Sequence, residues 1–358
     1  MSISAVHYQP IYYFTLLFLT IALGFRYSFY TEKRILMPKQ ENPLPSFMLC
    51  VACILFIGFR PISLVFVDMA GYASSMFLWE IPNSDYSWSH LNLIFDNFRV
   101  FFASNHFDIR WFFLIIAFVY YGAMWQACRK LFPFDTFFAF VVTLSAFSCF
   151  SYGTNGIKAG AATSVFLLAL AYHKHTWQAI LLALISWGLH HSMSMVVGAF
   201  IIAKLYNKPK FYVYFWLVSL WLAALHITFF QSVFQSIADE KGAEYLSEQQ
   251  YGKGFRADFI LYSAVPVIVG YYAIFHKKIK SVNFNFIYNC YLLTNGIWMI
   301  CMYAEFTNRI AYLSWFMYPI VLFYPFLNIE MGKNQYRSAI FVAFLHLGFT
   351  LFMSFIYY

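Results

Sequence analysis

Charged residues are scarce in this chain. Only 11% of its 358 residues are Asp, Glu, Lys or Arg, whereas about 25% is usual in a soluble domain. The composition is 62% hydrophobic, with 45 Phe and 28 Tyr, and apolar runs recur along the whole length. A soluble protein of this size could not bury so much apolar surface. The sequence therefore predicts an all-α, polytopic integral membrane protein.

The motifs of several enzyme classes are missing. There is no P-loop, Rossmann glycine pattern, H-E-x-x-H or G-x-S-x-G, which argues against nucleotide hydrolysis and zinc proteolysis. Cys50 and Cys53 form a C-x-x-C without a second Cys or His pair, so packing within a helix is favoured over a zinc or redox site. The net charge of +8 comes without a basic run that interleaves aromatics, and it fits cytoplasmic loops better than nucleic-acid binding. We expect no cofactor, metal or nucleic-acid partner.

The apolar runs predict the membrane crossings. A spanning helix needs about 20 residues, and shorter ones are tolerated beside protein. The predicted spans are 11–25, 46–59, 111–127, 134–152, 157–172, 211–230, 259–275, 284–304, 310–327 and 338–357, together with the longer run 177–203. The loop from Arg26 to Lys39 is rich in Lys and Arg, which predicts that it is cytoplasmic and that the N-terminus is outside.

A parity argument divides the run 177–203. Lys130 and Lys204 are both predicted to be cytoplasmic, so an even number of crossings must separate them. The spans 134–152 and 157–172 supply two, and one long helix over 177–203 would make the number odd. Two short helices with a break near Gly188 resolve the conflict, because a broken helix is tolerated at membrane depth where it lines a cavity. This predicts about 11 to 12 transmembrane helices, including short broken helices near 177–204.

The domain organisation follows from the same pattern. We expect a single transmembrane domain over 1–358, with both termini outside. Its outer loops are predicted at 60–110 and 231–258, and these carry most of the acidic residues.

His190 and His191 lie at the predicted break. Ionisable groups at membrane depth are costly and often mark functional sites. A neutral imidazole can act as a general base or orient a sugar hydroxyl. Adjacent residues on a helix point about 100° apart, so we expect different roles and no metal site, which would need more ligands. An ordinary interhelical hydrogen bond remains the alternative for either histidine.

Two basic residues fall on the same predicted outer surface. Arg60 follows a helix that Pro61 ends, and its guanidinium could bind a phosphate bidentately or extend to lipid headgroups. Lys158 follows a tight turn that contains Asn155, where a helix start with a cation could bind an anion. A plain turn with close helix packing is the alternative there.

The second half of the chain adds three charged candidates at the same surface. Arg256 lies in the predicted outer loop, and Glu305 and Arg309 bracket a short outer turn. At four residues apart, Glu305 and Arg309 could pair with each other. Otherwise Glu305 could be a base or a sugar contact.

The chain resembles the EpsG family of bacterial membrane proteins, which is grouped with Wzy-type polysaccharide polymerases. Three places carry the resemblance: Phe59-Arg60-Pro61 with Asp68-x-x-x-Tyr72, Asn155-Gly-Ile-Lys158-Ala-Gly160, and His190-His191-Ser192. The family usually has Arg-Gln where this chain has Lys158-Ala159, and Lys keeps the charge but lacks the bidentate fork.

The resemblance implies polymerisation of undecaprenyl-diphosphate-linked repeat units in O-antigen, capsule or exopolysaccharide synthesis, at the outer face of the bacterial inner membrane. We expect a glycosyltransferase in which Arg60, Lys158 and Arg256 or Arg309 neutralise the diphosphate. His190, Asp68 or Glu305 would be the base, with His190 preferred. Tyr72, Asn155 and His191 are further substrate-binding candidates. Expected partners are the lipid-linked glycan and membrane lipid, with a chain-length regulator as a further candidate.

Two other functions remain open. A flippase or transporter of lipid-linked oligosaccharides would favour paired charges near the midplane and repeated halves, and no clear internal repeat is seen. A membrane acyltransferase that modifies a polysaccharide also uses histidine at the membrane edge. No predicted cytoplasmic loop is long enough to indicate a soluble acyl-CoA site.

Overall fold

The computed structural model describes residues 3–28, 40–79, 90–237 and 254–357. These residues form helices, and no strand occurs among them. Five of the helical stretches are long and apolar enough to cross a membrane by length and composition: Ala5–Ser28, Ile109–Leu131, Ala257–His276, Thr307–Asn328 and Gln335–Tyr357. The prediction of an all-α, polytopic membrane protein is confirmed. The number of crossings and their orientation stay predictions.

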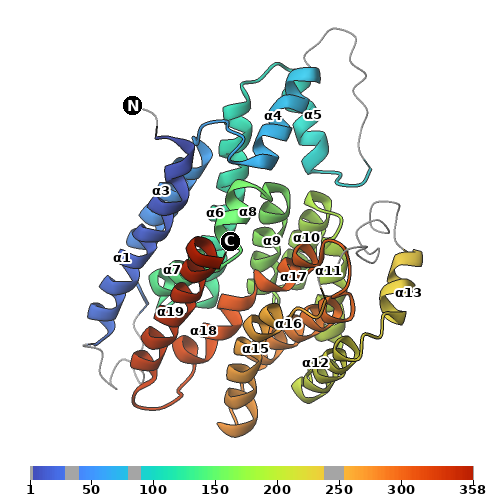
Figure 1. The fold of residues 1–358 in the computed structure, drawn as a ribbon. Helices are drawn as coiled ribbons and strands as arrows, with labels where there is room; N and C mark the ends of the chain where they lie inside the picture. The colour runs from blue at the N-terminus through green and yellow to red at the C-terminus, as the bar shows by residue number, and fades with distance from the viewer. Residues whose placement is uncertain (1–2, 29–39, 80–89, 238–253, 358) are drawn as a thin grey trace. The chain divides into compact units, whose positions relative to one another are not determined.

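The chain divides into two compact units, residues 1–194 with 326–358, and residues 195–325. The described helices of the first unit are η1 (Ala5–His7), α1 (Tyr8–Ser28), α3 (Leu44–Gly58), α4 (Val67–Trp79), α5 (Phe95–Ser104), α6 (Ile109–Leu131), α7 (Thr136–Leu144), α8 (Cys149–Thr154), α9 (Ile157–Ala171), α10 (Thr176–Leu189), α19 (Gln335–Phe352) and η3 (Met353–Tyr357). Figure 1 shows α4 and α5 side by side. The described part of the predicted outer loop 60–110 therefore contains α4 and α5.

Helices α6, α9 and α10 form the centre of the first unit. Helix α9 packs against α6 and against α10, and α6 also packs against α3 (Figure 1). Small residues make this close packing possible. A Cβ at Gly160 would collide with the Tyr152 carbonyl oxygen, so only glycine fits between α8 and α9. On the other side, the Ser186 hydroxyl of α10 donates to the Ala162 carbonyl of α9 at 2.7 Å.

The predicted span 134–152 is not one helix. It is divided into α7 and α8 by a turn at residues 145–148. Such a break exposes backbone carbonyls that would be costly in lipid. Four side chains from other helices bond to carbonyls in or beside the break: Tyr12 to Leu144 at 2.8 Å, Tyr120 to Cys149 at 3.0 Å, Thr350 to Ser145 at 2.8 Å and His346 to Val142 at 3.1 Å. Helices α1, α6 and α19 thus stabilise the interruption.

The predicted break in 177–203 is present. Helix α10 ends at Leu189 and α11 begins at Met193, and His190 between them has an extended backbone with φ −148° and ψ 118°. Gly188 itself remains helical. Its carbonyl accepts a hydrogen bond from the Ile94 N–H at 2.8 Å, and a side chain at Gly188 would press on Ile94. The break therefore lies two residues after the glycine, and the glycine instead admits the segment that precedes α5.

The second unit, described by itself, contains most of α11 (Met193–Leu205), then α12 (Pro209–Ala224), α13 (Phe229–Ile237), α15 (Ala257–Tyr271), η2 (Tyr272–His276), α16 (Val282–Ile300), α17 (Thr307–Trp315) and most of α18 (Tyr318–Asn328). The predicted spans 211–230 and 310–327 each contain an interruption, between α12 and α13 and between α17 and α18. Residues 238–253 of the predicted outer loop 231–258 lie outside the described residues.

A buried amide joins four helices of the second unit. Asn295 on α16 donates to Ser263 of α15 at 3.1 Å and to Ser314 of α17 at 3.0 Å. Its Oδ1 accepts the indole N–H of Trp216 from α12 at 2.8 Å. Polar side chains that satisfy one another in this way hold apolar helices together.

Candidate functional site

A chain of polar contacts in the first unit joins one of the paired histidines to Lys158. Lys158, in the first turn of α9, has its Nζ 3.7 Å from Oδ1 of Asp96 on α5. The other carboxylate oxygen of Asp96 accepts a hydrogen bond from Nδ2 of Asn92 at 2.8 Å. Oδ1 of Asn92 accepts the backbone N–H of His191 at 3.0 Å and lies 3.1 Å from Nδ1 of its ring. We call Lys158, Asp96, Asn92 and His191 the relay.

The relay is held by the segment that precedes α5. Asn92 is only 3% exposed, and the backbone bond from Ile94 to Gly188 fixes this segment against the end of α10. The side chains of Lys158 and Asp96 are 23% and 16% exposed, so the charged end of the relay reaches the surface. The relay therefore runs from His191 through a buried amide to a partly accessible cation.

The two histidines have different surroundings. Their rings stack with centroids 5.1 Å apart. Nδ1 of His190 accepts the backbone N–H of Ser192 at 3.2 Å, while Nε2 of His191 lies 3.4 Å from the Ser192 hydroxyl. Nδ1 of His191 is directed at Asn92 instead. The two rings therefore have different hydrogen-bond partners, but they stack and His190 is extended, so the separation of about 100° expected on a helix does not apply. Separate roles for the two histidines stay a prediction.

Arg60 is buried, whereas the sequence predicted it at the outer surface. It is only 3% exposed, and it donates to the carbonyls of Ile57 at 2.7 Å and of Thr154 at 2.8 Å. Among the described residues no carboxylate pairs with it, and the rings of Phe66 and Phe113 lie 5.4 and 5.3 Å from its guanidinium. Burial lowers the pKa of Arg60 to about 10, so it stays charged at neutral pH.

These contacts make Arg60 a clamp between helix ends. Ile57 lies in the last turn of α3, and Thr154 is the last residue of α8. Lys158 follows Thr154 by four residues, after the turn at Asn155. Arg60 thus holds the turn that presents Lys158, and its guanidinium is not exposed at the membrane edge. The Asn155 Oδ1 in this turn is buried and accepts no hydrogen bond from the described residues.

Tyr72 and Asp68 lie on α4, the helix that packs beside α5 of the relay. The Tyr72 ring is 5.5 Å from the ring of Phe95 and 5.6 Å from the guanidinium of Arg99. Asp68 is exposed one turn earlier on α4. Tyr72 therefore belongs to the surroundings of the relay, and Asp68 lies on the same helix.

The remaining candidates belong to the second unit. Arg256 forms a bidentate pair with Asp258 at 2.9 and 2.7 Å and stacks on the Phe259 ring at 3.5 Å. The guanidinium of Arg256 is thus paired with a carboxylate of the protein itself. Glu305 and Arg309 are exposed, and the Arg309 guanidinium lies 4.8 Å from the Phe306 ring.

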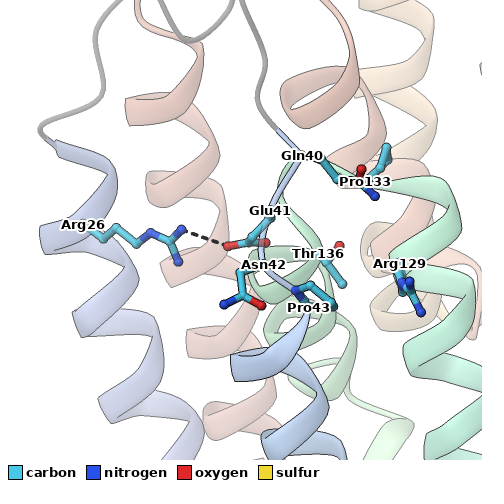
Figure 2. A pocket seen from close by; sticks show the side chains of 8 residues that line it. All are labelled: Arg26, Gln40, Glu41, Asn42, Pro43, Arg129, Pro133 and Thr136. Atoms are coloured by element: carbon cyan, nitrogen blue, oxygen red, sulfur yellow. Dashed lines mark hydrogen bonds and ion pairs between the residues drawn. The ribbon is translucent and has the colours of Figure 1, made fainter.

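A cavity of about 590 Å³ lies elsewhere in the first unit. Figure 2 shows it among the end of α1, the start of α3, the end of α6 and the start of α7, with Arg26, Glu41 and Arg129 in its wall. Arg60 instead follows the other end of α3 and contacts Phe113 near the start of α6. The cavity is therefore separate from the relay.

Comparison with known proteins assigns the chain to a family. The family model of the EpsG family matches residues 45–358. The chain belongs to the EpsG family. The match covers α3 to the C-terminus and so includes the relay, both histidines and Arg60. The EpsG family is associated with polysaccharide biosynthesis. Neither a curated protein nor a solved structure shows significant similarity to this EpsG-family chain.

Sequence reasoning missed three members of the site. Asn92, Asp96 and Arg99 lie in the predicted outer loop 60–110, where polar residues are common and carry no motif. The available signal was the spacing of Asn92 and Asp96, four residues apart at the start of a helix, where side chains meet.

Proposed function

We propose that this EpsG-family protein polymerises lipid-diphosphate-linked oligosaccharide repeat units in the synthesis of a bacterial surface polysaccharide. One observation carries the proposal, namely the relay that joins Lys158 to His191. Charged and polar groups are costly in so apolar a protein and commonly mark function. A cation linked to an imidazole is also the pair of groups that glycosyl transfer from a diphosphate requires.

The reaction is a glycosyl transfer. A hydroxyl oxygen of the acceptor repeat unit forms a bond to the anomeric carbon of the growing chain. The bond from that carbon to the lipid diphosphate breaks, and the diphosphate leaves with the electron pair. The hydroxyl proton passes to a base on the protein.

Lys158 is proposed to stabilise the charge that develops on the diphosphate. It is held by Asp96 at 3.7 Å and lies beside the Arg60-clamped turn. Asn155 and Tyr72 border this position and are proposed sugar contacts. The proposed base is one of the paired histidines, and Asp68 and Glu305 are alternative proton acceptors.

The proposed location is the bacterial inner membrane, with the site at its outer face. The distribution of Lys and Arg supports this orientation, since 15 of the 23 basic residues lie in the loops that begin at Arg26, Arg129, Lys174, Lys204, Lys277 and Lys333. A flipped, lipid-linked unit would meet Lys158 and His191 on this side.

A deletion strain of the native host tests the proposal. Loss of a polymerase should leave single repeat units on the lipid at the outer face, whereas loss of a flippase should leave them at the inner face. The variant Lys158→Met should reproduce the polymerase phenotype. Lys174→Met is the matched control, because Lys174 is an exposed residue after the other end of α9. Inner-face accumulation, or full polymer with Lys158→Met, would refute the proposed role.

A further inference from the structure

The amide orientation of Asn92 is determined by its neighbours. Oδ1 accepts the backbone N–H of His191 at 3.0 Å, and Nδ2 donates to the Asp96 carboxylate at 2.8 Å. Exchanging the two atoms would set N–H against N–H and oxygen against carboxylate, which loses both hydrogen bonds. Oδ1 therefore faces His191.

This orientation selects the tautomer of His191. Nδ1 of His191 lies 3.1 Å from Oδ1 of Asn92, an atom that can only accept. Nδ1 must then carry the hydrogen. In the neutral ring the lone pair lies on Nε2, so Nε2 is the atom that can take up a proton.

The neighbouring histidine has the opposite tautomer. Nδ1 of His190 lies 3.2 Å from the backbone N of Ser192, and a backbone N–H can only donate. Nδ1 of His190 is therefore the acceptor, and the hydrogen of the neutral ring lies on Nε2. His190 is arranged to donate from Nε2.

We infer that the two histidines divide the reaction, with His191 as the general base and His190 as a hydrogen-bond donor to the sugar or diphosphate oxygens. This inference rests on the proposed function. The proton of the attacking hydroxyl passes to Nε2 of His191 as the new glycosidic bond forms and the diphosphate leaves. Asn92 and Asp96 are positioning residues that hold His191 in the required tautomer, as a carboxylate or amide behind an imidazole does in other enzymes. The sequence-based preference for His190 as the base is replaced.

The tautomers can be measured without any activity. In protein labelled with ¹⁵N-histidine and reconstituted in bilayers, the two ring nitrogens of a neutral histidine give distinct signals according to which one is protonated. Subtracting spectra of His190→Gln and His191→Gln assigns the two residues among the 10 histidines. We expect protonated Nδ1 for His191 and protonated Nε2 for His190. The same tautomer at both residues would overturn the inference.

Paired substitutions test the roles in catalysis. The side-chain nitrogen of Asn takes the place of Nδ1 of histidine, and that of Gln takes the place of Nε2. His190→Gln keeps a donor at the Nε2 position and should retain activity within about tenfold, whereas His190→Asn should not. Both His191→Asn and His191→Gln remove the proton acceptor and should lower the rate by about 10²- to 10⁴-fold. Full activity of either His191 variant would overturn its role.

The positioning role of Asn92 has its own measurement. Asn92→Leu should lower both the rate and the fraction of His191 with protonated Nδ1, and leave the His190 signal unchanged. Asn92→Asp retains the acceptor and should restore both quantities in part. Loss of activity with an unchanged His191 tautomer would contradict positioning through His191.

The assay uses full-length protein in proteoliposomes with lipid-linked glycan extracted from the deletion strain. If the wild-type protein makes no longer chains, the proposed function fails. If it does so and the His191 variants do as well, only the division between the histidines fails. The control variant is Ser104→Ala, because Ser104 is an exposed residue at the end of α5 whose loss should not change the rate.

Discussion

Replacing Arg60 by Met distinguishes a structural clamp from a phosphate ligand. The side chain is 3% exposed and donates to the carbonyls of Ile57 and Thr154. Removing it takes the side-chain donor from the buried Thr154 carbonyl, at about 1–3 kcal/mol, whereas the Ile57 carbonyl keeps backbone donors. Relief of the buried charge offsets part of this cost. We expect the free energy of unfolding to fall by about 1–3 kcal/mol.

Chemical unfolding of the purified protein in mixed micelles measures this change. Arg110→Met is the matched control, because Arg110 is an exposed residue in the first turn of α6. Its unfolding free energy should stay within about 0.5 kcal/mol of the wild-type value. An Arg60→Met protein of unchanged stability that has lost polymerisation would refute the clamp and restore the phosphate contact predicted from the sequence.

Three further substitutions test helix packing within the two units, each by the same unfolding measurement. Gly160→Ala should destabilise the protein, because the new Cβ meets the Tyr152 carbonyl. Gly122→Ala is the control: a Cβ there has open space, and the change should be neutral or stabilising by up to about 1 kcal/mol. Equal effects of the two substitutions would contradict the close approach of α8 and α9. Asn295→Leu should lower the free energy of unfolding by about 2–3 kcal/mol, since it leaves several buried donors and acceptors unpaired. An unchanged stability would show that the amide does not hold these helices together. Glu41→Gln should lower the free energy of unfolding by about 1–2 kcal/mol, because the carboxylate accepts from Arg26 and from the N-terminal turn of α7. A wild-type stability that does not change with salt concentration would count against this contribution of the charge.

The break between α10 and α11 was predicted from the positions of Lys and Arg along the chain. The parity argument placed Lys130 and Lys204 on the same side and counted 134–152 as one crossing. The structure divides 134–152 into α7 and α8, so the argument reached the break with one of its spans wrongly drawn. No pattern of charged residues indicated the break between α7 and α8. The run 134–152 is mostly apolar, and the carbonyls in and beside its break accept bonds from Tyr12, Tyr120 and other side chains far away in the sequence.

The candidate site was predictable in Lys158 and the two histidines, but not in Asn92 and Asp96 or in the roles of its members. Lys158, His190 and His191 stood out because polar groups are rare in apolar stretches. Whether a guanidinium is exposed or bonded to two carbonyls depends on helices distant in sequence, so the clamp formed by Arg60 required the structure. The assignment of different tautomers to the histidines likewise depends on Asn92, which precedes His191 by 99 residues.

Reconstituted polymerisation tests the central claim most directly. Wild-type protein in proteoliposomes, supplied with extracted lipid-linked repeat units, should produce a ladder of longer lipid-linked chains. The variants Lys158→Met and His191→Asn should leave single units under the same conditions. A wild-type protein that moves the units across the bilayer without joining them, or a ladder of normal length from both variants, would contradict the account.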